Sequence, residues 1–143
     1  MGYPNILALE VVLGADQTTV AAGELTALTT TLTNPQNEGI ALVNAVGTLK
    51  SAGGTVAGDT FDVRLYKDAS IICTETVKTP DTNPRIPFAL TAVVAIANTG
   101  TGTQTLSLRV IRTGGTGTIA VDAGGGAKRS KIAWIFVPNA QVV

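Results

Sequence analysis

The stretches Thr60-Phe-Asp-Val-Arg-Leu-Tyr66 and Thr105-Leu-Ser-Leu-Arg-Val-Ile111 alternate between apolar and polar side chains. Successive side chains of a β-strand point to opposite faces, so this period of two predicts strands with one buried and one solvated face. A third stretch, Phe88 to Ile96, has the same period. The residues that the pattern directs inward are Phe61, Val63, Leu65, Phe88, Leu90, Ala92, Val94, Ile96, Leu106, Leu108 and Val110, with Ser107 and Arg109 facing outward.

Further strand-like segments follow along the chain, separated by turns rich in glycine, threonine and asparagine. We expect them over residues 3–13, 25–33, 40–49, 71–78, 118–122 and 131–138. Segment 71–78 should form a hairpin with 60–66, and 118–122 should pair antiparallel with 105–111. The last segment is apolar at nearly every position, which predicts a strand buried between two layers.

A proline-rich connection separates two of these strands. Its sequence is Thr79-Pro-Asp-Thr-Asn-Pro-Arg-Ile-Pro87. Proline cannot donate a hydrogen bond to a sheet, so we expect a long exposed loop here.

Together these segments predict an all-β protein with about eight to ten strands and no helix. Their regular spacing favours a single jelly-roll-like antiparallel β-sandwich. A chain of 143 residues has the length of one domain. We divide it into an N-terminal arm with the first strand over residues 1–12 and a β-sandwich domain over 13–143.

The composition predicts association between copies. Hydrophobic residues make up 45% of the chain and charged residues only 14%, with ten basic and ten acidic side chains. A typical domain is about one quarter charged, so a large apolar surface must be covered here, most simply by other subunits. A net charge of zero argues against nucleic acid or an anionic membrane as partner. No apolar run approaches the roughly 20 residues of a membrane helix, and Glu10 interrupts any signal-peptide pattern.

Few residues are suited to catalysis. The chain has no histidine and a single cysteine. Cys73 lies in an apolar strand, where a buried inert thiol is expected rather than a nucleophile. Asp59 and Asp62 do not have the spacing of a calcium loop, so we interpret them as a solvated turn residue and an outward strand carboxylate. We expect no catalytic residue, metal or cofactor, although sequence spacing leaves open a carboxylate pair for glycoside hydrolysis.

Three further groups have two interpretations each. The basic cluster Lys128, Arg129 and Lys131 is either a solubilising rim or a contact for an acidic protein. The apolar residues of the last strand are either a ligand platform or, as we expect, part of the core or of a subunit interface. The N-terminal tip is either a frayed end or an arm that docks on a neighbour. The apolar residues of the last strand are Ile132, Trp134 and Phe136, and the residues of the N-terminal tip are Tyr3, Pro4 and Asn5.

The succession of strands also resembles that of a known group of proteins. The segments are Ala57 to Asp68, Gln104 to Val110, Gly115 to Val121 and the terminal Ser130-Lys-Ile-Ala-Trp-Ile-Phe-Val137. They are similar to the strand series of small phage virion proteins, whose jelly rolls are like those of tumour-necrosis-factor and complement globular heads. The resemblance covers about residues 55 to 138; the first 54 residues match it less closely.

This resemblance implies a non-enzymatic virion protein that forms a homotrimer. Such a protein would be made in the host cytoplasm and would bind the outer surface of the major capsid shell as a decoration or cement protein. The alternative is a tail-fibre tip or another receptor- or carbohydrate-binding module; the absence of a shaft repeat favours decoration. Neither nucleic acid, membrane nor a small molecule is an expected partner. The residues that we expect to contact the capsid are Tyr3, Pro4, Asn5, Pro80, Asn83, Pro84 and Arg85.

Overall fold

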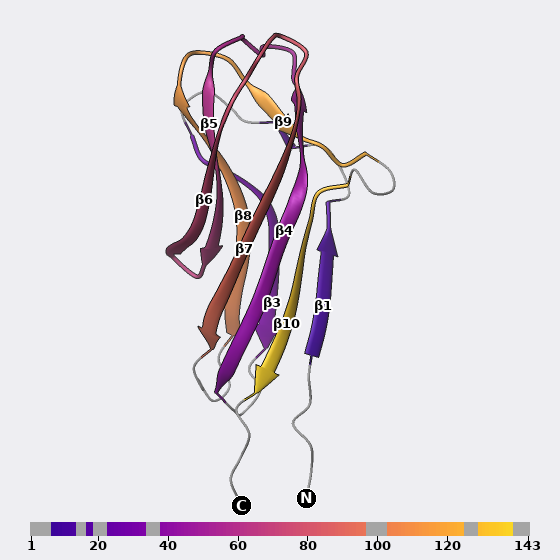
Figure 1. The fold of residues 1–143 in the computed structure, drawn as a ribbon, viewed down its shortest axis with the longest axis vertical. Coiled ribbons are helices and arrows are strands. Elements are labelled where there is room, and N and C mark those ends of the chain that lie inside the picture. Colours follow the sequence, from indigo (N-terminus) through magenta and orange to yellow (C-terminus); the bar gives the residue numbers. More distant parts are fainter. Residues whose placement is uncertain are drawn as a thin grey trace, which may run out of the picture.

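The computed structural model describes residues 7–13, 17–18, 23–33, 38–96, 103–124 and 129–138. Within these residues the chain forms ten β-strands and no helix (Figure 1), which confirms the all-β prediction. The strands are β1 (Leu7–Val12), β2 (Gln17–Thr18), β3 (Leu25–Thr33), β4 (Gly39–Ser51), β5 (Thr60–Lys67), β6 (Ser70–Lys78), β7 (Arg85–Ile96), β8 (Thr103–Gly114), β9 (Ile119–Val121) and β10 (Lys131–Pro138).

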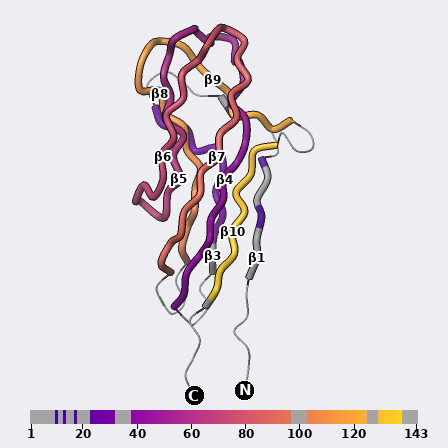
Figure 2. Tube along the Cα trace, viewed as in Figure 1, coloured from indigo at the N-terminus to yellow at the C-terminus, as the bar shows by residue number. Residues whose placement is uncertain are grey.

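The strands form two antiparallel sheets. One has six strands in the order β1-β10-β4-β9-β2, with β7 on the remaining edge of β4; the other has four in the order β3-β8-β5-β6. Figure 2 shows β4, β7 and β10 running side by side along the long axis. β10 and β9 occupy successive parts of the same edge of β4, opposite Gly39–Val46 and Leu49–Ser51. The chain crosses repeatedly between the sheets, as in a jelly roll, which confirms the predicted fold class.

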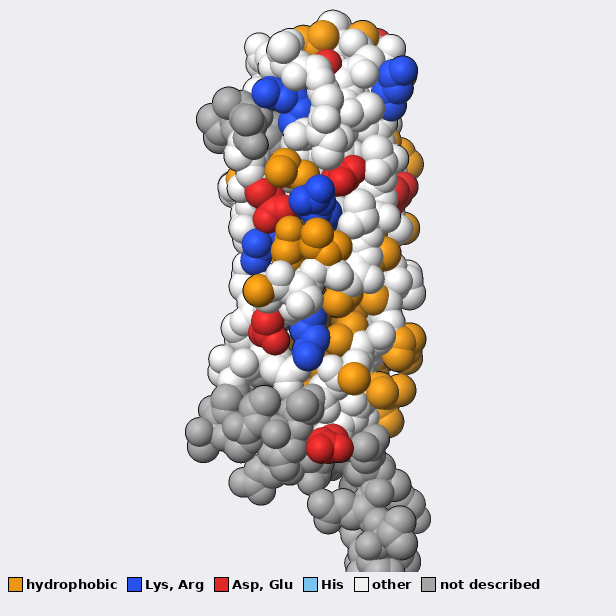
Figure 3. All heavy atoms as spheres, turned by 90° about the vertical axis from the view of Figure 1, so that its left-hand side faces the viewer, with side chains coloured by type: hydrophobic (Ala, Val, Ile, Leu, Met, Phe, Trp, Pro, Cys, Tyr) orange, Lys and Arg blue, Asp and Glu red, His pale blue; other side chains and the backbone are white. Residues whose placement is uncertain are grey.

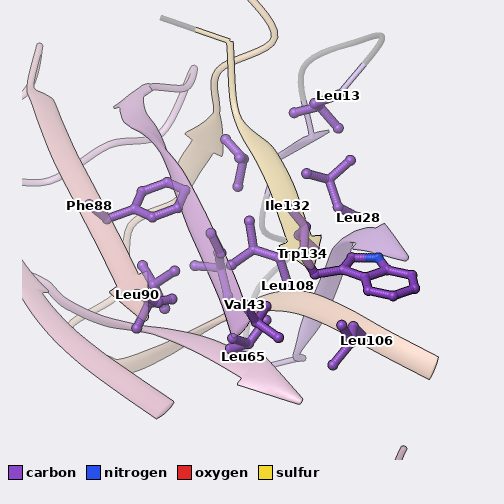
Figure 4. Close-up of a cluster of buried hydrophobic side chains, with 14 of the residues drawn as sticks. Leu13, Leu28, Val43, Leu65, Phe88, Leu90, Leu106, Leu108, Ile132 and Trp134 are labelled. Atoms are coloured by element: carbon purple, nitrogen blue, oxygen red, sulfur yellow. The ribbon is translucent and has the colours of Figure 1, made fainter. Parts of the chain in front are cut away.

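The core lies between the two sheets and contains the residues predicted from alternation, except that Ala92 is only partly buried against it. Phe61, Val63 and Leu65 of β5 are fully buried, and the hairpin of β5 with β6 forms as expected. Leu90 and Leu108 meet them from β7 and β8 (Figure 4). Half of each amphipathic strand is therefore removed from water, which is the main source of stability of such a sandwich.

One predicted strand pairing is wrong. Residues 118–122 were expected to pair with 105–111, but β9 pairs with β4 and with β2 in the other sheet. In the turn after β8, which leads to the other sheet, Gly115 adopts a φ of 87°, a conformation that favours glycine. Ile119 and Val121 are then buried in the core from the opposite side.

The predicted loop over residues 79–87 is also shorter than expected. β7 begins at Arg85, and Pro87 lies within it opposite Thr48 of β4. β7 pairs only with β4 among the described strands, so it is an edge strand. A proline is tolerated there because one side of an edge strand needs no donor.

Candidate interaction surface

The outward side of β10 is the first sign of a surface suited to binding. Ile132, Trp134 and Phe136 point into the core and are at most 2% exposed, as Figure 4 shows for the first two. Ile135 between them is 43% exposed. The prediction that this strand is buried on both faces was wrong, because no described segment of the chain covers its outer side.

Apolar residues of β4 and β7 continue this surface. In the strand register, Leu42 lies opposite both Ile135 and Val93, and Ile40 lies opposite both Val137 and Ala95. Directly opposed residues have Cβ atoms about 5 Å apart, so these two rows are continuous. We call the outward side formed by Ile40, Leu42, Val93, Ala95, Ile135 and Val137 the apolar face.

The exposure of this face sets it apart from the rest of the described surface. Ile40, Leu42 and Val93 are 44%, 45% and 65% exposed. Together with Ile135 they account for four of the six exposed large hydrophobic residues in the described ranges. Figure 3 shows hydrophobic side chains gathered toward the lower right of the molecule, where few charged side chains lie. A contiguous apolar patch of this kind marks a contact surface.

Polar residues close the apolar face at one end. A shallow hollow of about 580 Å³ lies beside Leu42 and Ile135, and Asn44, Thr91 and Ala133 line it. Thr91 donates a hydrogen bond of 3.4 Å to Asn44 Oδ1. At the rim, Lys131 Nζ lies 3.4 Å from Glu10 Oε2. Glu10 is the one charged residue that lines the hollow, and apolar side chains form most of the rest of its lining.

The outer side of the four-stranded sheet is different, because it carries a network of polar side chains centred on Glu24. The Glu24 carboxylate accepts hydrogen bonds from Tyr66 Oη at 2.8 Å, Arg109 at 3.1 Å and Arg64 at 3.3 Å. The Arg109 guanidinium lies 4.0 Å from the centre of the Tyr66 ring, a cation–π contact. Partial burial raises the pKa of Glu24, but the hydrogen bonds from Tyr66 and Arg109 outweigh it and hold the pKa below its usual value.

This network also corrects the prediction for Ser107. The residue is on the outward side, as expected, but it is buried, with 2% of its surface exposed. Arg109 Nε donates a hydrogen bond of 3.0 Å to Ser107 Oγ and lies over it. The alternating pattern predicts on which face of the sheet a residue lies. It does not predict whether a long side chain next to it, here that of Arg109, shields the residue from solvent.

The expected capsid-contact residues lie away from the apolar face where the structure describes them. Arg85 is opposite Lys50 at the far end of β4 from Ile40. Pro80 and Asn83 are exposed and Pro84 is buried. Ser51 Oγ donates a 2.8 Å hydrogen bond to Asn83 Oδ1, which fixes the loop to β4. The other three candidates, Tyr3, Pro4 and Asn5, lie outside the described residues.

Asp122 forms ion pairs with residues of β4 and β7. Its side chain is 3% exposed and forms ion pairs with Lys50 at 3.2 Å and Arg85 at 3.0 Å. The Gly124 N–H donates to it at 2.8 Å. Burial raises the pKa of Asp122, but the hydrogen bonds from Gly124 and Lys50 outweigh this and lower the pKa overall.

Two residues differ from their predicted environment. Cys73 is half-buried at the edge of the core rather than enclosed. Asp59 is 5% exposed, not solvated, because its carboxylate accepts the N–H groups of Thr116 and Gly117 in the turn after β8. Asp62 is partly exposed and accepts a hydrogen bond of 2.9 Å from Arg64.

The remaining candidates for chemistry are dispersed. No three histidine, cysteine, aspartate or glutamate side chains of the described ranges come together as metal ligands would. Arg129 of the basic cluster is exposed, Lys131 is paired with Glu10, and Lys128 is outside the described residues. No helix capable of spanning a membrane occurs in the part of the chain that the structure describes.

Sequence patterns predicted the inward side of this sheet but missed the apolar face. A signal was present in the unbroken apolar character of residues 132–138 and 40–43. Such a run indicates that both sides of a strand are covered, but not whether the cover comes from the same chain.

No family model matches the sequence, and no curated protein matches it. Among solved structures the chain is similar to coat protein VP2 of infectious bursal disease virus. A mutant VP2 in derived T=1 particles aligns at 12% identity over 94% of this chain and 41% of that one, with a TM-score of 0.43. The Gx strain aligns at 12% over 92% and 38%, with a TM-score of 0.42. A VP2 subviral particle aligns at 14% over 94% and 37%, with a TM-score of 0.37. The chain spans about two fifths of the length of these structures.

Proposed function

We propose that this chain is a non-enzymatic structural protein of a virion that associates with copies of itself through the apolar face. The observation that carries the proposal is that Ile40, Leu42, Val93 and Ile135 form one surface on a single sheet, which no described segment of the chain covers. A protein of zero net charge gains little protection from charge repulsion, so such a surface favours association between copies.

The energy available is consistent with association. Complete burial of an aliphatic side chain contributes about 1.5–3 kcal/mol, so each half-exposed residue here contributes roughly 1 kcal/mol per contact. The four residues together give only part of the 4–15 kcal/mol or so that association costs. Several contacts within a closed assembly are therefore needed. A homotrimer, the form that the sequence resemblance implies, repeats the contact three times.

In the finer form of the proposal, the trimer is a decoration or cement protein on the outer surface of the major capsid shell. It is made in the host cytoplasm and needs no cofactor. Jelly rolls are frequent in viral capsid and lectin domains, which agrees with this role and with the receptor-binding alternative. The loop residues Pro80, Asn83, Pro84 and Arg85 and the tip residues Tyr3, Pro4 and Asn5 are the proposed shell contacts. A trimer presents them three times, so weak single contacts add to firm attachment.

Co-sedimentation with empty shells of the major capsid protein tests this role. We expect the protein to pellet with the shells at a fixed stoichiometry and Pro80→Arg to reduce the pelleted fraction, because Pro80 is exposed in the proposed contact loop. Lys78→Ala, exposed at the end of β6, is the matched control and should pellet like the wild type. Binding to host cells or glycans without binding to shells would contradict decoration and support a fibre tip.

A further inference from the structure

β3 is an edge strand with a free side. It pairs with β8 at the end of the four-stranded sheet, and no described strand pairs with its other edge. The register shifts once, between Thr26 and Leu28, and then runs regularly from Leu28 to Thr33. An edge strand of this kind presents a row of N–H and C=O groups to any extended segment that approaches it.

The opposite side of the sandwich is protected against such pairing. Pro87 of β7 has no N–H group, and the Ala89 N–H donates a 3.1 Å hydrogen bond to Glu75 Oε2 on β6. Charged residues on edge strands disfavour pairing because a new partner would desolvate them, and β6 carries Glu75 and Lys78. β3, with the sequence LTALTTTLT, contains neither proline nor a charged residue.

The sequence of β3 is complementary to itself. Leu28-Thr-Thr-Thr-Leu32 reads the same in both directions about Thr30. In an antiparallel pair centred on Thr30, Leu28 lies opposite Leu32 and Thr29 opposite Thr31. Leu28 is buried whereas Thr29 and Thr31 are exposed, so the Thr pairs would lie on the outer side of the joined sheet. Each cross-strand pair of this kind contributes about 0.2–1 kcal/mol.

We propose that β3 pairs antiparallel with β3 of a second copy, about a two-fold axis at Thr30. The two four-stranded sheets then form one continuous sheet of eight strands. This contact goes beyond the proposed function because it uses a sheet edge instead of the apolar face. A two-fold contact at the edge and a three-fold contact at the face together link neighbouring trimers.

Substitutions at the two surfaces separate the two contacts. Thr31→Lys places a charge at the β3 edge, and Leu42→Lys places one in the apolar face; both side chains are exposed in the single chain. One chain has a mass of 14.5 kDa. By sedimentation equilibrium we expect Thr31→Lys to have the mass of a trimer, Leu42→Lys the mass of a dimer, and the double variant the mass of a monomer. The wild type should exceed a trimer. Ile71→Lys, exposed on β6 at the opposite edge, is the control and should match the wild type.

The possible outcomes distinguish the edge contact from the proposed function. A monomeric Leu42→Lys variant, or a Thr31→Lys variant of wild-type mass, would overturn pairing of β3 with itself and leave the apolar face in place. A Thr31→Lys variant of wild-type mass would also be obtained if the natural partner of β3 were a strand of another protein. A Leu42→Lys variant of wild-type mass would instead overturn association through the face and leave the edge contact standing.

Cysteine cross-linking tests the register. Thr29→Cys and Thr31→Cys are each made together with Cys73→Ser, which removes the single native cysteine. Opposed residues of an antiparallel pair have Cα atoms about 4.5–5.5 Å apart, within the range that a disulfide bridges. Under mild oxidation, a mixture of the two variants should give cross-linked dimers, and each variant alone should give few. Absence of a cross-link in the mixture, or equal yields from each variant alone, would overturn the two-fold axis at Thr30.

Discussion

Asp59 holds the turn that carries the chain from one sheet to the other. Its buried carboxylate accepts the N–H groups of Thr116 and Gly117. The same carboxylate leaves no room for a side chain at Gly115, where a Cβ atom would lie 1.8 Å from Asp59 Oδ1. Sequence spacing gave no indication of this role, since the two segments lie far apart in the chain and meet only in the fold.

Asp59→Ala should therefore lower the free energy of unfolding. The substitution leaves two backbone donors without their acceptor, which costs about 1–3 kcal/mol in buried surroundings. Urea unfolding of the two proteins measures the difference. Glu38→Ala, which removes an exposed carboxylate, is the control and should change stability by less than about 0.5 kcal/mol. An Asp59→Ala variant as stable as this control would contradict the role of the carboxylate.

Asp122 should make stability depend on pH. Its pKa is lowered in the folded protein, so its contribution is present above the unfolded pKa of about 3.9 and is lost as the pH falls through the folded value. We expect the difference in unfolding free energy between the wild type and Asp122→Asn to shrink as the pH falls below about 4. Urea titrations at several pH values measure it. A difference that is constant across this range would show that the carboxylate charge does not contribute.

At the scale of elements, alternation predicted where most strands lie and which way they face. β5, β7 and β8 bury the apolar residues expected from a period of two, apart from the partly buried Ala92. It failed where the environment is set by distant parts of the chain. β9 is only three residues long, and alternation within so short a strand did not identify its partners β4 and β2 in the other sheet. β10 is apolar from Ile132 onward, and its sequence does not show whether its outer side is covered by its own chain or by another copy.

The two sides of β10 should respond differently to truncation. Trp134→Ala removes a large buried side chain and should lower the unfolding free energy by about 3–5 kcal/mol. Ile135→Ala, on the apolar face, should change the stability of the dissociated chain by less than about 1 kcal/mol but weaken association. Denaturant unfolding at low protein concentration separates the two effects. A large loss of monomer stability in Ile135→Ala would show that the chain itself covers this side.

At the scale of the whole molecule, the sandwich has two unlike outer faces. The four-stranded sheet carries the network around Glu24, whose hydrogen bonds are made within the chain. The six-stranded sheet carries the apolar face, with Leu42 at its centre. Composition alone predicted that a surface must be covered between copies. The strand register was needed to locate that surface. Ile40 of β4, Val93 of β7 and Ile135 of β10 are far apart in the chain and come together only because β7 and β10 both pair with β4.

The central claim is that other copies cover the apolar face in solution, and the reactivity of a thiol at Val93 tests it most directly. Val93→Cys, made together with Cys73→Ser, places the thiol at a position that is 65% exposed in the single chain. Ile71→Cys in the same background is the control, 49% exposed on the other sheet. We predict slow labelling at Val93→Cys that accelerates on dilution, and fast labelling of the control at every concentration. Equally fast labelling at both positions, at all concentrations, would contradict the account.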